Sequence, residues 1–271
     1  MEIVRAIVLG AVQGLTEFLP ISSSGHLILV REAFDWPDNG LAFDVGLHLG
    51  TLLALLAYFS RDWVRMAASG VRNLRARGVR LAAYEGDGRL LLLLALGTVP
   101  AGIAGLLLDG WIESNVRQAW IVALTLIGFG IVLLLSDRMG TKERSLGSVG
   151  LKDAIVVGIA QAFALIPGVS RSGVTISAAL GLGFERETAA RFAFLLGTPA
   201  FVGAGILKAA DLAGAGEVDP WPLVAGFLTS LIVGLLAVHW LLGFLRQRSV
   251  EPFVVYRVAL GALTLLLVAL A

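Results

Sequence analysis

One apolar stretch near the N-terminus carries most of the side chains in this chain that could perform chemistry. Around Pro20 it places a carboxylate, three hydroxyls and an imidazole, on Glu17, Ser22, Ser23, Ser24 and His26. A serine and a histidine within reach of each other are the minimum for nucleophilic or base-assisted group transfer. Spacings of three and four residues put His26 on the helical face of Ser23 and Ser22. Ser23 is our first choice of nucleophile with His26 as its base, and direct attack by His26 or by water stays open.

The C-terminal half repeats this stretch in altered form. Residues 6–25 and 154–173 align without a gap and are identical at eight of twenty positions. In the second copy, Leu165 stands in the place of Glu17 and Arg171 in the place of Ser23. We interpret the two copies as one ancestral element specialised in two directions. The first copy keeps the acid and the base, and the second supplies a cation.

Composition indicates that membrane helices position these residues. Hydrophobic residues make up 57% and charged residues 15% of the chain, and the mean hydropathy is +0.86, which excludes an ordinary soluble domain. A net charge of +1 gives no indication of nucleic acid, and the absence of cysteine excludes disulfides and thiolate metal sites. Apolar segments of about 20 residues, the length that spans a bilayer, fall near 41–60, 89–109, 118–136, 187–210, 221–245 and 253–271.

The two copies of the motif lie in apolar segments of a different kind, near 3–30 and 152–182. Each is interrupted by a proline, which disfavours helix in the residue before it. Each segment is therefore either a re-entrant helix–loop–helix or a single broken span. Arginines in the loops 61–88 and 137–152 indicate the cytoplasmic side, and only the re-entrant arrangement also keeps Arg246 and Arg248 there. We favour the re-entrant arrangement.

The sequence thus predicts an all-α polytopic membrane protein with an inverted-topology repeat, built from six transmembrane helices plus two re-entrant helix–loop–helix hairpins. Residues 1–271 form a single integral membrane domain, with residues 1–140 as the first inverted repeat and 150–271 as the second. The broken tips of the two hairpins are expected to meet near the bilayer midplane. Because many transporters share this architecture, a transporter or flippase for a phosphorylated isoprenoid lipid is the alternative function.

The expected tips form an anion site. Serine is a preferred N-cap, so helices should restart near residues 22–24 and 170–172 and direct free N–H groups at a phosphate. Arg171 can clamp phosphate oxygens in a bidentate way. A carboxylate in a phosphate site requires a cation between the two, so Glu17 implies Mg²⁺ or Ca²⁺. The substrate-binding candidates at the tips are Gln13, Thr16, Ser22, Ser24, Gly25, Ser170, Ser172 and Gly173.

Structural explanations compete with these functional ones. Serine and glycine in membrane helices often permit close packing only. Glu17 and Arg171 could form a structural ion pair across the repeat interface, although ionisable groups at such depth are usually functional. Asp44 and His48, near the outer end of the second span, are explained equally well by packing or capping.

The two motifs, Gln13-Gly-Leu-Thr-Glu-Phe-Leu-Pro-Ile-Ser-Ser-Ser-Gly-His26 and Pro167-Gly-Val-Ser-Arg-Ser-Gly173, resemble those of the undecaprenyl-diphosphate phosphatases of the BacA type. The resemblance covers the whole chain, through Phe43-Asp44-Val45 and His48-Leu49-Gly50-Thr51 to Tyr256-Arg257. It implies a multi-pass phosphatase of the bacterial plasma (inner) membrane that converts the C55 lipid diphosphate to its monophosphate for cell-wall synthesis. It also implies bacitracin resistance, bacitracin competing for the substrate, a divalent metal, and an active site open to the periplasmic face.

The motif residues of that family fall here on Glu17, Ser22, Ser23, His26, Ser170, Arg171 and Ser172. Some members begin the first motif with Glu where this chain has Gln13, which leaves Glu17 as the only strong anionic metal ligand. For Arg257, near the cytoplasmic end of the last span, snorkelling to lipid headgroups competes with the role in substrate binding that the resemblance suggests. The oligomeric state, with a homodimer as one option, stays open.

Overall fold

The computed structural model describes residues 3–37, 40–116, 118–211 and 219–270, and these residues form helices joined by turns. The only strand-like feature among them is one isolated bridge between Arg144 and Phe184. The helices are α1 Ile3–Phe18, α2 Ser23–Ala33, α3 Gly40–Tyr58, α4 Ser60–Arg77, α5 Gly86–Asn115, α6 Ala119–Met139, α7 Leu151–Ala162, α8 Arg171–Gly181, α9 Arg186–Asp211, α10 Pro220–Leu245 and α11 Glu251–Leu270. The predicted all-α class is confirmed.

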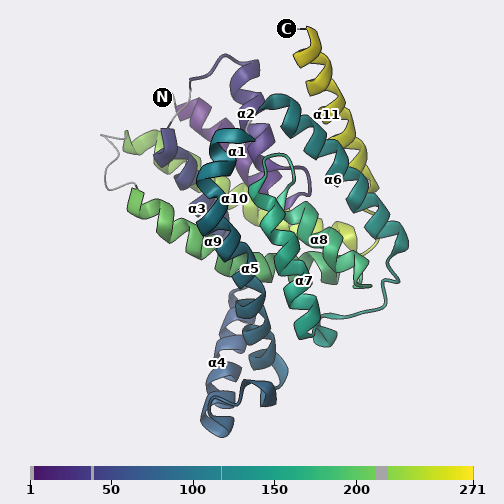
Figure 1. The fold of residues 1–271 in the computed structure, drawn as a ribbon. Helices are drawn as coiled ribbons and strands as arrows, with labels where there is room; N and C mark the ends of the chain where they lie inside the picture. The colour runs from purple at the N-terminus through teal and green to yellow at the C-terminus, as the bar shows by residue number, and fades with distance from the viewer. Residues whose placement is uncertain (1–2, 38–39, 117, 212–218, 271) are drawn as a thin grey trace.

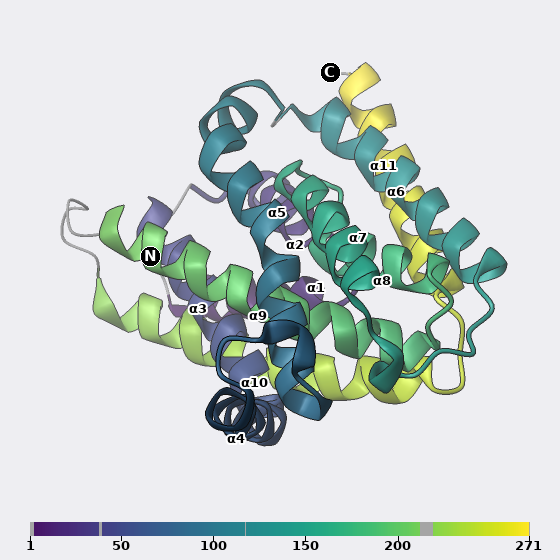
Figure 2. The ribbon, with the colours of Figure 1, turned by 60° about the horizontal axis from the view of Figure 1, so that its bottom comes forward.

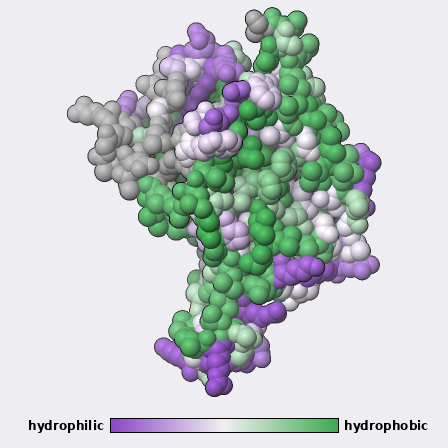
Figure 3. All heavy atoms as spheres, in the orientation of Figure 1, coloured by the Kyte–Doolittle hydropathy of each residue, from purple (hydrophilic) through white to green (hydrophobic). Residues whose placement is uncertain are grey.

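By length and composition, five helices of the described chain can cross a membrane: α5, α6, α9, α10 and α11. A sixth span results if α3 and α4, which meet at a bend of 67°, are counted as one. Apolar side chains cover most of the visible body of the molecule, and hydrophilic residues gather towards its ends (Figure 3). The chain is therefore a multi-pass membrane protein, as predicted.

The region 61–88 is more ordered than the loop that we expected. Helix α4 occupies most of it and projects from the body beside the start of α5 (Figure 1). Met66, Ser69 and Asn73 recur at helical spacing on the buried face of α4. The Asn73 Nδ2 group donates to the Glu85 carbonyl at 3.1 Å, so α4 is fastened to the residue before α5. Four of the arginines in this region, Arg61, Arg65, Arg72 and Arg75, are exposed side chains of this helix. Likewise, α5 extends to Asn115 and takes up most of the expected connection at 110–117.

Both motif segments are broken at the predicted places. Helix α1 ends at Phe18 and α2 restarts at Ser23, while α7 gives way to a short 3₁₀ turn at Phe163–Leu165 and α8 restarts at Arg171. The residues that precede the restarts, Ser22 and Ser170, have positive φ angles of 75° and 69°. Such angles are unfavourable for a residue with a side chain, so the surrounding contacts must hold the backbone of both serines in place.

The two halves of the chain pack on each other reciprocally. Helix α1 packs on α10 and α7 packs on α5, and α6 lies along α11 (Figures 1 and 2). A β-carbon on Gly10 of α1 would lie 2.5 Å from the Gly226 carbonyl oxygen of α10, and one on Gly158 of α7 would clash with the Gly97 carbonyl of α5. Small residues thus bring the helices into backbone contact and fix where each break lies in the bundle.

Ion pairs hold one end of the bundle together. Around the start of α9, Arg186 pairs with Asp137 of α6 at 2.6 Å, and Arg191 pairs with Asp62 of α4 at 2.6 Å. In the connection that leads to α7, the hydrogen bond to Asp153 raises the pKa of the Arg144 guanidinium above its ordinary value. These contacts fix the helix ends next to the second motif segment.

Candidate active site

The two breaks are in direct contact, as predicted for the tips of the hairpins. The Ser172 hydroxyl at the start of α8 donates to the Leu19 carbonyl in the first break, at 3.0 Å. The Arg257 guanidinium of α11 donates to the Pro20 carbonyl at 3.1 Å and to the Gly168 and Val169 carbonyls at 3.0 and 2.9 Å. Residues far apart in the sequence are thereby brought to one place.

Arg257 does not snorkel to headgroups, so that expectation is wrong. Its side chain is 0% exposed. Besides the carbonyls of the two breaks, it donates to the Leu126 carbonyl of α6 at 3.2 Å. Four of the five N–H groups of the guanidinium are therefore used on backbone. The geometry of Arg257 suits holding the breaks together better than binding a substrate.

Glu17 is the centre of the polar cluster. It is 6% exposed and accepts hydrogen bonds from Gln13 Nε2 at 2.8 Å, Ser23 Oγ at 2.7 Å and Arg171 Nη2 at 2.9 Å. His48 Nε2 lies 3.9 Å from the same carboxylate. Arg171 also stacks on Phe201, with its guanidinium carbon 3.1 Å from the ring centre. The ion pair between the two halves thus exists, and it holds the Ser23 hydroxyl at its edge.

The histidine of the motif has a different partner from the one expected. His26 Nδ1 lies 2.6 Å from the Ser22 carbonyl oxygen, and Nε2 lies 2.7 Å from the Tyr256 hydroxyl. Because a carbonyl only accepts, Nδ1 carries a proton, and Nε2 of the neutral ring then accepts from Tyr256. The Ser23 hydroxyl donates to Glu17 instead. The expected hydrogen bond between His26 and a serine hydroxyl is therefore replaced by two others.

Tyr256 is the residue of this cluster that we did not single out from the sequence. Its ring lies nearly parallel to the His26 imidazole, with ring centres 5.5 Å apart. The side chain is 44% exposed and lies against one face of the His26 ring. The available signal in the sequence was its place beside Arg257, in the pair with which the family resemblance ends.

The remaining site candidates are mostly occupied with local hydrogen bonds. Ser170 Oγ accepts from the Gly173 backbone at 3.2 Å, and the Thr16 hydroxyl donates to the Val12 carbonyl of its own helix at 2.7 Å. A β-carbon on Gly173 would lie 2.6 Å from Arg257 Nη1, so glycine makes room for that side chain. The other candidates surround the same breaks: Gln13, Ser22, Ser24, Gly25 and Ser172. Their proposed roles in binding stay predictions.

The polar residues of the second span also belong near the site. His48 Nδ1 lies 2.8 Å from the Asp44 carbonyl oxygen, which directs Nε2 towards Glu17. The Asp44 carboxylate pairs with Arg31 of α2. Packing or capping alone therefore explains Asp44 better than His48, whose Nε2 faces the Glu17 carboxylate at 3.9 Å.

The oxygen atoms at the first break suit a hard divalent cation bound together with a phosphate. Among the described residues, no group of three or more histidine or acidic side chains could hold a metal. However, Gln13 Oε1 is buried without a hydrogen-bond partner there, close to the Glu17 carboxylate that Gln13 Nε2 contacts. Mg²⁺ is commonly bound by one or two carboxylates plus substrate phosphates and water. The available donors fit that mode better than a complete protein cage.

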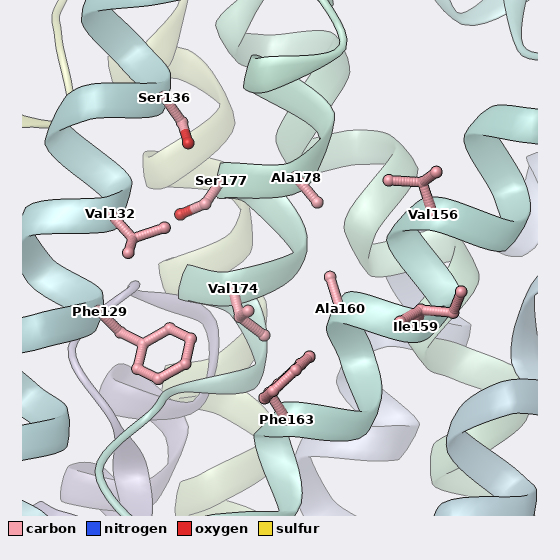
Figure 4. A pocket seen from close by; sticks show the side chains of 10 residues that line it. All are labelled: Phe129, Val132, Ser136, Val156, Ile159, Ala160, Phe163, Val174, Ser177 and Ala178. Atoms are coloured by element: carbon pink, nitrogen blue, oxygen red, sulfur yellow. The ribbon is translucent and has the colours of Figure 1, made fainter.

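An apolar groove lies beside the second break. It has a volume of about 300 Å³ and lies between α6, α7 and α8 (Figure 4). Phe163 lies four residues before Pro167 and Val174 lies three residues after Arg171, so residues on both sides of the second break line the groove. The lining residues are Phe129, Val132, Ser136, Val156, Ile159, Ala160, Phe163, Val174, Ser177 and Ala178. Its lining suits a hydrocarbon chain.

Comparison with known proteins agrees with the motifs. The family described as "Bacitracin resistance protein BacA" matches residues 6–263. The chain belongs to the BacA family. It is 49% identical over 274 residues to an undecaprenyl-diphosphatase of Geobacter sulfurreducens, covering 98% of both chains. It is 47% identical to undecaprenyl-diphosphatases of Hahella chejuensis, over 97% of both chains, and of Thermomicrobium roseum, over 100% of both chains.

Proposed function

We propose that this chain hydrolyses undecaprenyl diphosphate to undecaprenyl phosphate and inorganic phosphate in the bacterial plasma membrane. The observation that carries the proposal is the meeting of the two breaks, where Glu17, Ser23, His26 and Arg171 share one site. A protein that only bound or moved the lipid would need the Arg171 side chain and the helix N-termini to bind the diphosphate. It would not need a hydroxyl held by a carboxylate next to an oriented imidazole. The names of the relatives support the same substrate.

The chemistry follows from the positions of these groups. Arg171 turns from Glu17 to the terminal phosphate and, with the start of α8, stabilises its charge, which is the main requirement of phosphoryl transfer. The Ser23 oxygen attacks the terminal phosphorus, its proton passes to Glu17 or to His26 Nε2, and undecaprenyl phosphate leaves with the bridging oxygen. Water then releases inorganic phosphate from Ser23. Direct attack by His26, or by water that His26 activates, is the alternative first step.

We include Mg²⁺ or Ca²⁺ in the proposal as a requirement of the site. Glu17, with the free Gln13 Oε1 and substrate oxygens, would hold the cation. When bound, the cation would neutralise charge on the diphosphate and relieve its repulsion from the Glu17 carboxylate. Mg²⁺ suits so small a set of protein ligands better than Ca²⁺, which takes six to eight oxygens.

We assign the lipid tail to the apolar groove beside the second break. The apolar lining of the groove and its residues on both sides of the second break support this assignment. Water would be excluded from the tail while the diphosphate remains at the polar cluster.

We also propose the finer topology: an inverted repeat in which α1–α2 and α7–α8 are re-entrant hairpins and the site opens to the periplasmic face. The reciprocal packing of α1 on α10 and of α7 on α5 supports it. Because the chain has no cysteine, single cysteines at Arg75 and Arg248 can be labelled specifically. Both should react only from the cytoplasmic side, and labelling from opposite sides would contradict the arrangement.

An assay in detergent solution, where there is no membrane to transport across, distinguishes hydrolysis from transport. Protein purified in detergent with Mg²⁺ should release inorganic phosphate from undecaprenyl diphosphate, which a pure transporter cannot do. Folded protein that binds the lipid but releases no phosphate would support the transporter or flippase instead.

A further inference from the structure

Gln161, near the end of α7, carries a buried amide with no visible partner. The residue is 3% exposed, and both Nε2 and Oε1 lack a hydrogen-bond partner among the described residues. Leaving a buried polar group unpaired destabilises the folded protein, because the group has lost its hydrogen bonds to water. Native structures contain few such groups, and each one calls for a reason.

The internal repeat supplies the reason for the missing partner. Gln161 occupies the position of Gln13, whose Nε2 donates to Glu17 four residues later on the same helical face. Four residues after Gln161 the chain has Leu165. The amide was therefore kept in both copies, while its carboxylate partner is present only in the first.

The unpaired amide lies beside the cation of the second copy. A β-carbon built on Gly197 of α9 would lie 3.5 Å from Gln161 Oε1 and 3.8 Å from the Arg171 guanidinium carbon. Both side chains thus meet at the same point of α9. From Ala154 to Phe184 the sequence contains no aspartate or glutamate. The second copy of the motif therefore offers an anion the N–H groups of Gln161 and the positive charge of Arg171. The same segment contains no carboxylate that would repel the anion.

We propose that Gln161 binds the diphosphate of the substrate. Its Nε2 donates to a non-bridging phosphate oxygen next to those held by Arg171, so that the substrate supplies the acceptor that Leu165 removed. The inference rests on the proposed function for the identity of the anion. It adds a neutral amide donor to a site that otherwise binds phosphate by charge.

The test replaces the amide with a side chain of similar length and no polar atom. In Gln161→Met the orphaned group disappears, so the unfolding temperature should be unchanged or higher. The affinity of the same variant for pyrophosphate should fall by about ten- to a hundredfold, which is the range for losing a hydrogen bond to a charged group. Binding is measured as thermal stabilisation by inorganic pyrophosphate, and kcat/KM as phosphate release from farnesyl diphosphate. Gln161→Glu, which adds a negative charge at the same place, should bind pyrophosphate more weakly than Gln161→Met.

A matched control comes from another buried group without a partner. Trp63 Nε1 also lacks a hydrogen-bond partner in the described chain and lies in α4, away from the breaks. Trp63→Phe should leave pyrophosphate binding and kcat/KM unchanged.

The proposal is overturned if Gln161→Met binds pyrophosphate and turns over substrate like the wild type, which would mean that a buried water satisfies the amide. It is also overturned if both Gln161 variants unfold at markedly lower temperature with unchanged pyrophosphate affinity. Failure of the proposed function looks different: wild-type protein would bind pyrophosphate and release no phosphate from a lipid diphosphate.

Discussion

Arg257→Met tests how the two halves of the site are held in register. The substitution removes the four hydrogen bonds from the guanidinium to the carbonyls of Leu126, Pro20, Gly168 and Val169. A buried carbonyl that loses its partner costs about 1–3 kcal/mol. At the low end of that range, the variant loses about 4 kcal/mol of unfolding free energy. Because three of the four carbonyls belong to the breaks, we expect turnover to fall at least about a hundredfold as the breaks separate.

Arg257→Lys separates the effect of charge from that of geometry. Lysine keeps the positive charge but presents its three donors from one atom, so it cannot reach carbonyls on three segments together. We expect the stability of Arg257→Lys to lie between those of the wild type and Arg257→Met. Its turnover should be closer to that of Arg257→Met than to that of the wild type. Arg138 is the matched control. It is 63% exposed and lies 3.5 Å from Glu251, so it also joins α6 to α11. Arg138→Met should cost less than about 1 kcal/mol.

Stability is measured by denaturant unfolding in detergent and turnover by phosphate release, for all three variants side by side. Wild-type stability and turnover in Arg257→Met would refute the assignment of Arg257 as the residue that joins the breaks. Full activity with lowered stability would limit its role to folding.

Three further outcomes are expected from the site and the groove. Glu17→Gln should lower phosphate release at least about a hundredfold and abolish its dependence on Mg²⁺ in a metal titration; a normal Mg²⁺ response would remove Glu17 from the metal site. Tyr256→Phe, which deletes one hydrogen bond worth about 1 kcal/mol, should lower kcat about fivefold with little change in KM. Tyr58→Phe, which removes the 3.3 Å contact with His239, is its matched control, and equal effects of the two would contradict a role at the site. Ala178→Trp, which fills the groove, should raise KM for the C55 diphosphate several-fold more than KM for the C15 diphosphate, and an equal change for both would place the tail elsewhere.

Local chemistry in the sequence was enough to predict the breaks. Pro20 and Pro167 cannot continue a helix, and Ser22 and Ser170 are followed by restarted helices as expected. The contact between Glu17 and Arg171 was foreseeable for a related reason. Two copies of one element, each carrying one charge in an apolar segment, place those charges together when the copies meet.

The contacts that the sequence did not predict are made by partners distant in the chain. The hydroxyl of Tyr256 reaches His26 across 230 residues, and no periodicity encodes that pairing. Arg257 looked like a residue that could snorkel because it lies near a helix end. Its burial depends on room left by Gly173, where a β-carbon would lie 2.6 Å from Arg257 Nη1, and this close approach is visible only in three dimensions. Residues 61–88 were expected to form a loop, but most of their arginines are exposed side chains of helix α4.

Phosphate release from undecaprenyl diphosphate by the purified protein, with and without EDTA, tests the central claim most directly when Ser23→Ala and His26→Ala are measured beside the wild type. Metal-dependent release that both substitutions abolish is the predicted result. Survival of Ser23→Ala with loss of His26→Ala would move the nucleophile to the histidine or to water. No release from folded wild-type protein with any divalent metal would contradict a phosphatase at the meeting of the two breaks.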